Sequence, residues 1–278
     1  MTQRLAYLGP AGTYAEQAAL NHDPEADLLP FTSIPSVAAA VDSRVADTGV
    51  VPIENSLEGA VTFTLDLLIH ESTLFIRHEL VLPIHHCLLA MSGTQVASIK
   101  VIYSHPQSLA QCRLFLAKRF PEAQLVAAMS NALAVEQMQE AGNTAAAIAS
   151  ERAASIYGAK ILDRGIEDSP SNVTRFVVLA PTDHAPTGGD KTSICFGFDR
   201  DGSGILASVL TEFAQRGINL TKIESRPTRQ SLGRYIFLVD LEGHREDLIV
   251  AETLESVRKQ VSALKIFGSY PMHVSSAV

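Results

Sequence analysis

Short apolar runs alternate with helical patterns over roughly the first two thirds of the chain. The pattern predicts a buried strand at Arg4–Leu8, a turn rich in glycine, and a helix from Tyr14 to Asn21. Further strands are predicted at 49–53, 101–103 and 145–149. Further helices are predicted at 36–45, with Ser36 as N-cap, and from the turn after the strand 49–53 to about residue 70. Helices are also predicted at 106–119 and 131–141, and after the strand 145–149 as far as Gly158. Strands that alternate with helices predict an α/β fold with a mainly parallel sheet.

The last part of the chain follows a different order. Strands are predicted at 192–199, 218–225, 235–241 and 265–272, and helices at 204–216 and 246–263. This β-α-β-β-α-β order is the ferredoxin-like pattern. Residues 181–190 are rich in proline, glycine and polar residues, which is typical of a connector. We therefore predict two domains, residues 1–181 and residues 191–273.

Composition and charge exclude several classes of protein. The formal net charge is −8, no run of basic residues occurs and tryptophan is absent, so neither a nucleic acid nor an anionic membrane is an expected partner. Cys87, Cys112 and Cys195 are too scattered for a disulfide framework or a zinc site. No signal-peptide pattern is present, and the longest apolar run, Val81–Met91, is too short to cross a bilayer. We expect a cytoplasmic protein.

The turn Gly9-Pro10-Ala11-Gly12-Thr13-Tyr14 is the first candidate for chemistry. Its glycines let a ligand approach the backbone closely, and free N–H groups at the following helix start favour an anion. The turn lacks the lysine of a P-loop and the spacing of a dinucleotide fingerprint. A tight turn without a ligand explains the same residues.

Polar side chains also follow two of the other predicted strands. Glu54-Asn55-Ser56 comes after one strand, and Ser104-His105-Pro106-Gln107, with Gln111 one turn onward, comes after another. Asn55 can orient a substrate because its amide both donates and accepts, and Ser104 and Gln111 could face one cleft. Capping of the helices that follow explains Ser56, Ser104 and His105 about as well. His85 and His86 are adjacent in an extended run, so joint binding of a metal is not expected.

A threonine and an arginine stand where a further apolar strand begins. Thr174 offers a hydroxyl donor, and the guanidinium of Arg175 can bind a carboxylate through two hydrogen bonds. A solvated arginine at the edge of a strand is the alternative.

Together these motifs resemble prephenate dehydratases, in order and in spacing, over nearly the whole chain. Thr174-Arg175-Phe176 is the hallmark trio of that family. The C-terminal segment is similar to its regulatory ACT domain, as shown by 217–223, Glu224-Ser225-Arg226-Pro227 and 240–244. The resemblance is to the monofunctional form with a C-terminal ACT domain. It implies a two-lobed, periplasmic-binding-protein-like catalytic domain with its site in the cleft. One departure is Gly204-Ile205-Leu206, where the family usually has Gly-Ala-Leu.

The activity implied by this resemblance is that of a carbon–oxygen lyase of phenylalanine biosynthesis, which converts prephenate to phenylpyruvate with loss of water and carbon dioxide. No cofactor or metal is expected. Thr174 is expected to donate a hydrogen bond to the leaving hydroxyl. The remaining catalytic candidates are Asn55, Ser104 and Gln111, and the candidates for binding substrate are Gly12, Thr13, Ser56, Arg175 and Phe176.

Regulation and assembly are also implied by the resemblance. Phenylalanine is the expected effector, bound where ACT domains meet in a homodimer or homotetramer. The candidate effector residues are Gly204, Leu206, Asn219, Leu220, Glu224, Ser225, Arg226 and Pro227. Two alternatives stay open. An arogenate dehydratase would place a carboxylate, for which Glu54 is the candidate, against the substrate amine. A non-catalytic amino-acid sensor would have no need for the combination of Thr174, Asn55 and Gln111.

Overall fold

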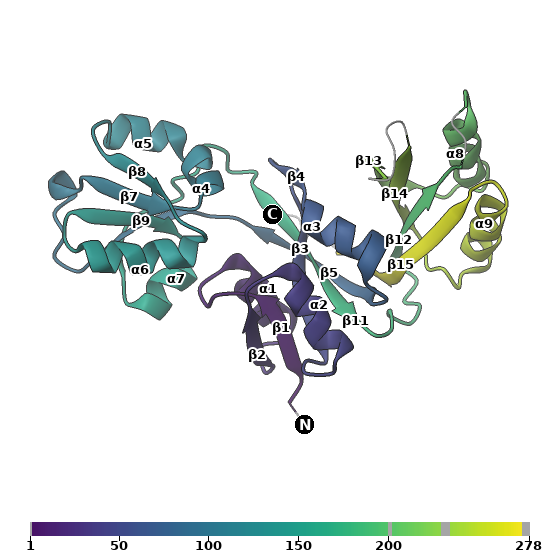
Figure 1. The fold of residues 1–278 in the computed structure, drawn as a ribbon, viewed down its shortest axis with the longest axis horizontal. Coiled ribbons are helices and arrows are strands. Elements are labelled where there is room, and N and C mark those ends of the chain that lie inside the picture. Colours follow the sequence, from purple (N-terminus) through teal and green to yellow (C-terminus); the bar gives the residue numbers. More distant parts are fainter. Residues whose placement is uncertain (1, 200–201, 229–233, 274–278) are drawn as a thin grey trace. The chain divides into compact units, whose positions relative to one another are not determined.

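The computed structural model describes residues 2–199, 202–228 and 234–273 (Figure 1). The chain divides into two compact units. The first unit contains Met1–Val61 and Val81–Phe176, and the second contains Thr62–Leu80 and Val177–Val278. None of the helices in the described ranges has the length and apolar character needed to cross a membrane.

One sheet is built around parallel strands near the N-terminus. Its strand order is β2-β1-β3-β11-β5, and β1 pairs in parallel with both β2 and β3. The elements are β1 (Arg4–Leu8), α1 (Tyr14–His22), β2 (Asp27–Phe31), α2 (Ile34–Asp42), β3 (Thr48–Asn55), β4 (Gly59–Ala60), β5 (Phe75–Pro83) and β11 (Val173–Ala180). Helix α2 starts earlier than predicted, because the Ser33 hydroxyl, rather than that of Ser36, accepts the capping hydrogen bond.

Another sheet, which lies within the first unit, has the order β10-β6-β9-β7-β8. Strands β7, β8 and β9 pair in parallel, whereas β6 and β10 are antiparallel. The bounds are β6 (Cys87–Ala90), η2 (Val96–Ser98), β7 (Val101–Ser104), α4 (Pro106–Gln111), α5 (Arg113–Arg119), β8 (Gln124–Ala127), α6 (Asn131–Ala141), β9 (Ala145–Ala149), α7 (Glu151–Tyr157) and β10 (Lys160–Arg164). The single helix predicted over 106–119 is divided at Cys112, whose backbone leaves the helical region.

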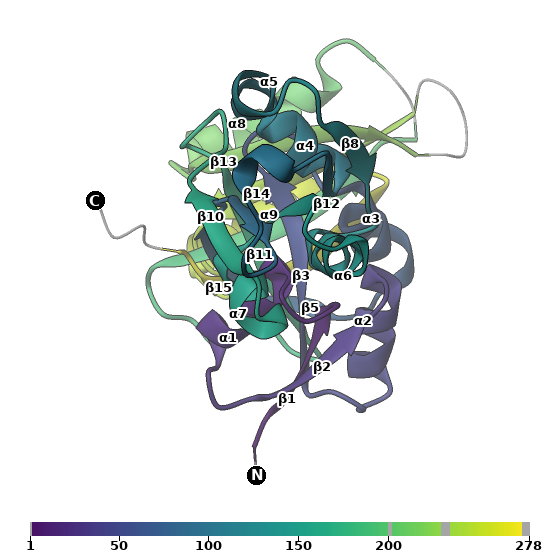
Figure 2. The ribbon, with the colours of Figure 1, turned by 90° about the vertical axis from the view of Figure 1, so that its left-hand side faces the viewer.

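Both faces of β9, the central strand of this sheet, are buried, which suits its run of small residues. Ala145, Ala147 and Ala149 pack in one core with α6 and α7, while Ala146 and Ile148 pack in another with α4 and α5. This division follows the period of two along a strand. Figures 1 and 2 show the two helix pairs on opposite faces of the sheet.

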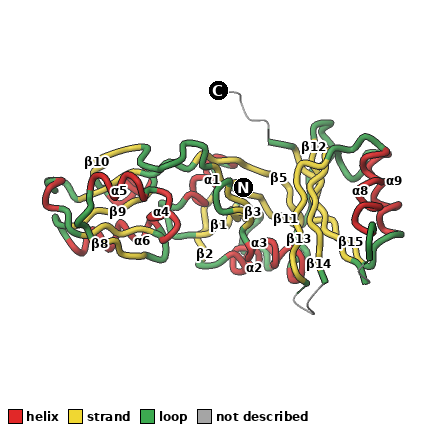
Figure 3. The backbone as a smooth tube through the Cα atoms, turned by 90° about the horizontal axis from the view of Figure 1, so that it is seen from above, coloured by secondary structure: helices red, strands yellow, loops and turns green. Residues whose placement is uncertain are grey.

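The second unit contains a four-stranded antiparallel sheet of order β13-β14-β12-β15. Its elements are α3 (Thr62–Asp66), the π-helical turn η1 (Leu67–Glu71), β12 (Asp190–Gly197), α8 (Ile205–Gln215), β13 (Leu220–Pro227), β14 (Tyr235–Glu242), α9 (Leu248–Arg258) and β15 (Ala263–Pro271). Helices α8 and α9 lie on the same face of the sheet (Figure 3). The predicted ferredoxin-like order is confirmed, although α9 is shorter than the pattern predicted.

Residues 62–80 pack against this C-terminal sheet although they are distant from it in sequence. Lys191 forms an ion pair of 2.8 Å with Glu79, and Arg226 forms one of 3.2 Å with Asp66. Gly268 lies so close to Ile76 that a Cβ at this position would be 2.2 Å from the Ile76 carbonyl oxygen, and its φ of +145° also favours glycine. Residues 62–80 and the ferredoxin-like sheet therefore form one packed unit.

Candidate active site

A cavity of about 410 Å³ opens in the first unit where strands end and helices begin. It is lined by residues from the turns after β1 and β7, from the starts of α1, α4 and α6, and from the strands β3 and β11. Among the described lining residues there is no Asp, Glu, Lys or Arg. The cavity is therefore polar without being charged.

Six of the predicted residues line this cavity. They are Gly12, Thr13, Asn55, Gln111, Thr174 and Phe176. The sheet explains part of this grouping: Asn55 is the last residue of β3, and Thr174 and Phe176 share one face of β11 because side chains alternate along a strand.

Arg175, predicted to bind a carboxylate, is not among the residues that line the cavity. Alternation directs it to the opposite face of β11 from Thr174 and Phe176, and its guanidinium Nη1 lies 3.5 Å from Glu54 Oε2. The structure thus places the predicted pair of hydroxyl and guanidinium on two different faces.

Ser104 and Ser56 also lie outside the cavity lining. Ser104 is completely buried, and its single hydroxyl proton is shared between two acceptors, Ile148 O at 2.9 Å and Asn131 Oδ1 at 3.0 Å. The Ser56 hydroxyl donates to Ser171 O and accepts from the Val173 N–H, both at 3.0 Å. Both hydroxyls therefore hold the frame of the site instead of facing its interior.

The Asn55 amide fixes the direction in which Thr174 can donate. Its Oδ1 accepts from the N–H groups of Leu57 and Glu58 at 3.0 and 3.1 Å. Its Nδ2 must then be the end that faces Thr174 Oγ1, and it donates there at 2.9 Å. Because Thr174 accepts this bond, its own hydroxyl proton is available for a group in the cavity.

Two further residues complete the polar network and were missed from the sequence. Asn172 Oδ1 accepts from Asn55 Nδ2 at 2.8 Å, and its Nδ2 donates to Gln111 Oε1 at 3.0 Å. His86 Nε2 lies 2.9 Å from the same oxygen of Gln111. The period of two before Thr174 could have indicated Asn172, but no local signal indicates His86.

The described lining of the cavity offers helix N-termini, and no Lys or Arg side chain, to an anion. Burial lowers the pKa of both His86 and His105, so these rings are neutral near pH 7. Helix α6 begins at the cavity with Ser130 as its N-cap, and α1 begins there with Thr13. Helix N-termini carry partial positive charge and suit a carboxylate.

The predicted contribution of the Gly12 N–H is not available, however. This N–H donates to Glu16 Oε2 at 2.7 Å, and Arg152 binds both oxygens of the same carboxylate at 2.8 and 2.9 Å. Burial opposes ionisation of Glu16, but the hydrogen bonds from Arg152 and Gly12 outweigh it and hold the pKa of Glu16 below its ordinary value. The glycine turn is therefore tied down by an ion pair outside the cavity lining.

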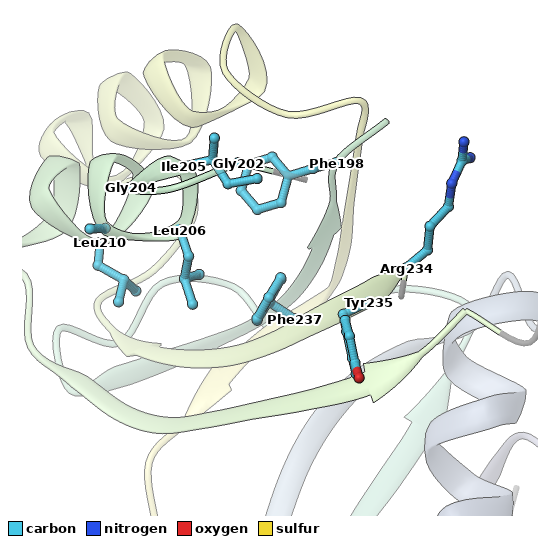
Figure 4. A pocket seen from close by; sticks show the side chains of 10 residues that line it. Phe198, Gly202, Gly204, Ile205, Leu206, Leu210, Arg234, Tyr235 and Phe237 are labelled. Carbon is cyan, nitrogen blue, oxygen red and sulfur yellow. The ribbon is translucent and has the colours of Figure 1, made fainter. Parts of the chain in front are cut away.

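A second cavity, of about 480 Å³, lies in the second unit between α8 and β14. Figure 4 shows Leu206 and Leu210 projecting from α8, with Phe237 on the neighbouring strand and Arg234 extending away from these apolar side chains. Of the predicted effector residues, Gly204 and Leu206 line this cavity. Gly204 caps α8 with a φ of +86°, a conformation that favours glycine.

The other predicted effector residues lie along β13 or directly before it, outside this cavity lining. Asn219 Nδ2 donates to Glu242 Oε1 at 2.9 Å, and Lys222 forms an ion pair of 3.4 Å with Glu224. Leu220, Ser225, Arg226 and Pro227 belong to the same strand. The single chain thus holds the predicted effector residues in two separate groups.

The fold and the site define an α/β domain with a polar cleft, joined to an ACT module. Residues 5–184 match the family described as "Prephenate dehydratase", and residues 200–259 match "ACT domain". The chain therefore belongs to the prephenate dehydratase family. The predictions of family, fold class and lyase class are confirmed.

Named relatives agree with this membership. The chain is 45% identical to a bifunctional chorismate mutase/prephenate dehydratase of Aquifex aeolicus, over 96% of this chain and 73% of the relative. It is 40% identical to arogenate dehydratase 1 of Petunia hybrida, over 99% of this chain and 68% of the relative. A solved prephenate dehydratase from Arthrobacter aurescens, in complex with L-Phe, superposes with a TM-score of 0.89 at 36% identity, covering 97% of this chain and 90% of that one.

Proposed function

We propose that the cavity of the first unit converts prephenate to phenylpyruvate. The ring carboxylate leaves as carbon dioxide, and the ring hydroxyl takes up one proton and leaves as water. The observation that carries this proposal is the Thr174 hydroxyl, which accepts from Asn55 and is thereby free to donate into the cavity.

Thr174 acts on the leaving hydroxyl. A threonine is far too weak an acid to give up its proton completely near pH 7, so it donates a hydrogen bond into the charge that develops on the departing oxygen. A preorganised donor of this kind contributes about 3–4 kcal/mol, or about 10²–10³ in turnover. Asn55 holds the hydroxyl in this direction, and Phe176 forms part of the wall against which the ring packs.

The uncharged lining suits the decarboxylation. A cation facing the ring carboxylate would stabilise the charge that has to leave, whereas a neutral, poorly solvated position favours its loss as carbon dioxide. The pyruvyl carboxylate, which stays, can be held by the start of α6 at Ser130 and by the Nε2 of Gln111.

The lining also supports prephenate over arogenate as substrate. Arogenate carries an amine that a carboxylate would recognise, and Glu54, the candidate for that role, is not among the described lining residues. The arogenate dehydratase relative shows that the family also contains proteins named for the other substrate.

We further propose that phenylalanine regulates the enzyme through the ACT domain. The apolar lining of the second cavity suits an aromatic side chain, and the Arthrobacter relative was solved with L-Phe. The proposed domains are residues 1–181 and 191–273, and the proposed assembly is a homodimer or homotetramer in which the groups at Gly204 and at 219–227 come together across ACT domains. A cytoplasmic location is supported by three buried cysteines that form no disulfide.

The proposal is tested by supplying prephenate and arogenate separately to the purified protein. We expect phenylpyruvate from prephenate and a kcat/KM at least tenfold lower with arogenate, since its amine finds no carboxylate in the lining. A higher kcat/KM with arogenate would reassign the substrate. No turnover of either compound by folded protein, together with tight binding of phenylalanine, would favour the sensor.

A further inference from the structure

A continuous series of hydrogen bonds connects the candidate catalytic residues to one another. It connects Thr174 to Asn55 at 2.9 Å, Asn55 to Asn172 at 2.8 Å, Asn172 to Gln111 at 3.0 Å and Gln111 to His86 at 2.9 Å. Thr174, Asn55, Gln111 and His86 line the cavity, but Asn172 does not. Asn172 is 1% exposed, and it joins the Thr174–Asn55 pair to the Gln111–His86 pair in this series of hydrogen bonds.

The donor and the acceptor of every hydrogen bond in this series follow from the orientation of the Asn55 amide. Backbone N–H groups of Leu57 and Glu58 require the oxygen of the Asn55 amide on their side, so its nitrogen faces Asn172. Asn172 must then present its oxygen to Asn55 and its nitrogen to Gln111. An amide turned the other way would place like groups against each other.

Gln111 inherits its orientation from Asn172. Its Oε1 accepts from Asn172 and faces His86 Nε2, which must therefore carry a proton. The buried ring of His86 stays neutral, and its Nδ1 lies 3.1 Å from the Tyr14 hydroxyl. With its oxygen held from two sides, Gln111 turns its two Nε2 protons toward the cavity.

We propose that Asn172 is a positioning residue that passes the fixed orientation of Asn55 on to Gln111. Asn55, held by the backbone, directs the Thr174 hydroxyl, and Asn172 directs the Gln111 amide N–H₂, so that both present protons to the substrate. This inference rests on the proposed dehydratase function, but it concerns a residue that does not itself face the substrate. It also explains why Asn172, a buried residue two positions before Thr174, points toward Asn55 as Thr174 does.

Asn172→Asp tests this role because aspartate keeps the acceptor for Asn55 and removes the donor for Gln111. An ionised aspartate repels Gln111 Oε1, so the glutamine turns its oxygen toward the cavity. We expect kcat/KM for prephenate to fall about 10²-fold, since one donor of the site is reversed and now repels an anionic substrate. Asn21→Asp makes the same chemical change at an exposed position and should leave kcat/KM within about twofold.

The same substitution in a Gln111→Ala background separates positioning from mere structure. If Asn172 acts through Gln111, the effect of Asn172→Asp shrinks to about tenfold or less when Gln111 is absent. An equal factor in both backgrounds would overturn the proposal, and so would native kinetics for Asn172→Asp. Thermal unfolding of each variant reports whether it is folded.

If Asn172→Asp does not fold, Asn172→Ser takes its place in the cycle, because serine is neutral and too short to bridge both amides. Asn172→Ser should lower kcat/KM less than the charged variant, because it releases Gln111 without reversing it, and part of this loss should disappear in the Gln111→Ala background. An equal factor in both backgrounds would again overturn the proposal. Wild-type protein that fails to turn over prephenate would sink the dehydratase proposal. Wild-type turnover with no coupling between positions 172 and 111 would sink only this inference.

Discussion

The two cavities of this chain differ in the polar groups that they present. The cavity of the first unit combines apolar side chains with amides, hydroxyls and neutral imidazoles, several of which are oriented by hydrogen bonds. The cavity of the second unit is lined mainly by Phe198, Ile205, Leu206, Leu210 and Phe237, with a glycine turn at the start of α8. One presents directed donors and the other presents apolar area.

This difference separates catalysis from recognition. Directed donors distinguish a transition state from a ground state, because they are placed where charge develops. Apolar area binds a ligand in proportion to the surface that it buries, and it promotes no bond breaking. A different kind of substitution should therefore impair each cavity: a change of charge or donor in the first, and a loss of apolar area in the second.

The largest effect is expected from Gln111→Glu, which puts a charge into the uncharged cavity with almost no change in shape. One oxygen of the new carboxylate can accept from Asn172 and His86, while the other faces an anionic substrate. We expect kcat/KM for prephenate to fall about 10³-fold at pH 8, from a lost donor and a new repulsion.

Activity of this variant should recover as the pH is lowered and the new carboxyl becomes protonated. The pH profile relative to wild type measures that recovery, and Gln124→Glu on an exposed edge strand is the matched control. Equal activities of Gln111→Glu and wild type at pH 8 would show that the absence of charge is unimportant.

A smaller effect is expected from Glu16→Gln, which removes the ion pair behind the glycine turn. Breaking a buried pair costs about 3–5 kcal/mol, but the Arg152 side chain is 33% exposed, so we expect a loss of about 1–3 kcal/mol in the free energy of unfolding at pH 7. Denaturant titration measures the loss, with Glu25→Gln at an exposed position as the control.

The pH dependence of this loss has a definite sign. Because the pKa of Glu16 is lower in the folded protein, its stabilisation is present above the ordinary glutamate value of 4.5 and disappears as the pH falls through the folded value. The difference between wild type and Glu16→Gln should therefore shrink below about pH 4.5. A difference that stays constant between pH 7 and pH 3.5 would contradict the role of ionised Glu16.

The smallest effect is expected from Leu206→Ala in the apolar cavity. The change removes three carbon atoms from a partly buried side chain, so the loss is smaller than the roughly 0.8 kcal/mol per carbon of full burial; a total of about 1.4 kcal/mol weakens phenylalanine binding roughly tenfold. Isothermal titration calorimetry with L-phenylalanine measures the change, and Leu248→Ala, whose side chain is 77% exposed on α9, is the control. Unchanged affinity of Leu206→Ala would place the effector elsewhere.

Local rules of the sequence predicted most of the fold. Helix starts at Thr13 and Ser130, and the order of elements in the ferredoxin-like sheet, follow from caps and periodicity. The strands β2, β4, β5, β6, β8 and β10 were not predicted. Of these, β2 and β8 are short, half-exposed edge strands, and β2 contains Pro30, so their patterns are weak.

The site was predictable only in part. Alternation along β11 could have indicated that Arg175 lies on the other face of the strand from Thr174 and that Asn172 lies on the same side as Thr174. Ser104 was grouped with Gln111 by helical spacing, but it belongs to β7, where that spacing does not apply. The bond between Asn55 and Thr174 joins residues 119 positions apart, and only the tertiary structure brings them together.

The most direct test of the central claim compares turnover of prephenate by wild type, Thr174→Ser and Thr174→Ala at saturating substrate. If the Thr174 hydroxyl donates to the leaving group, Thr174→Ala loses about 10²–10³ in kcat with little change in KM, while Thr174→Ser, which keeps the hydroxyl, stays within about tenfold of wild type. A kcat for Thr174→Ala within threefold of wild type would contradict the claim, because the cavity would then act without its directed hydroxyl.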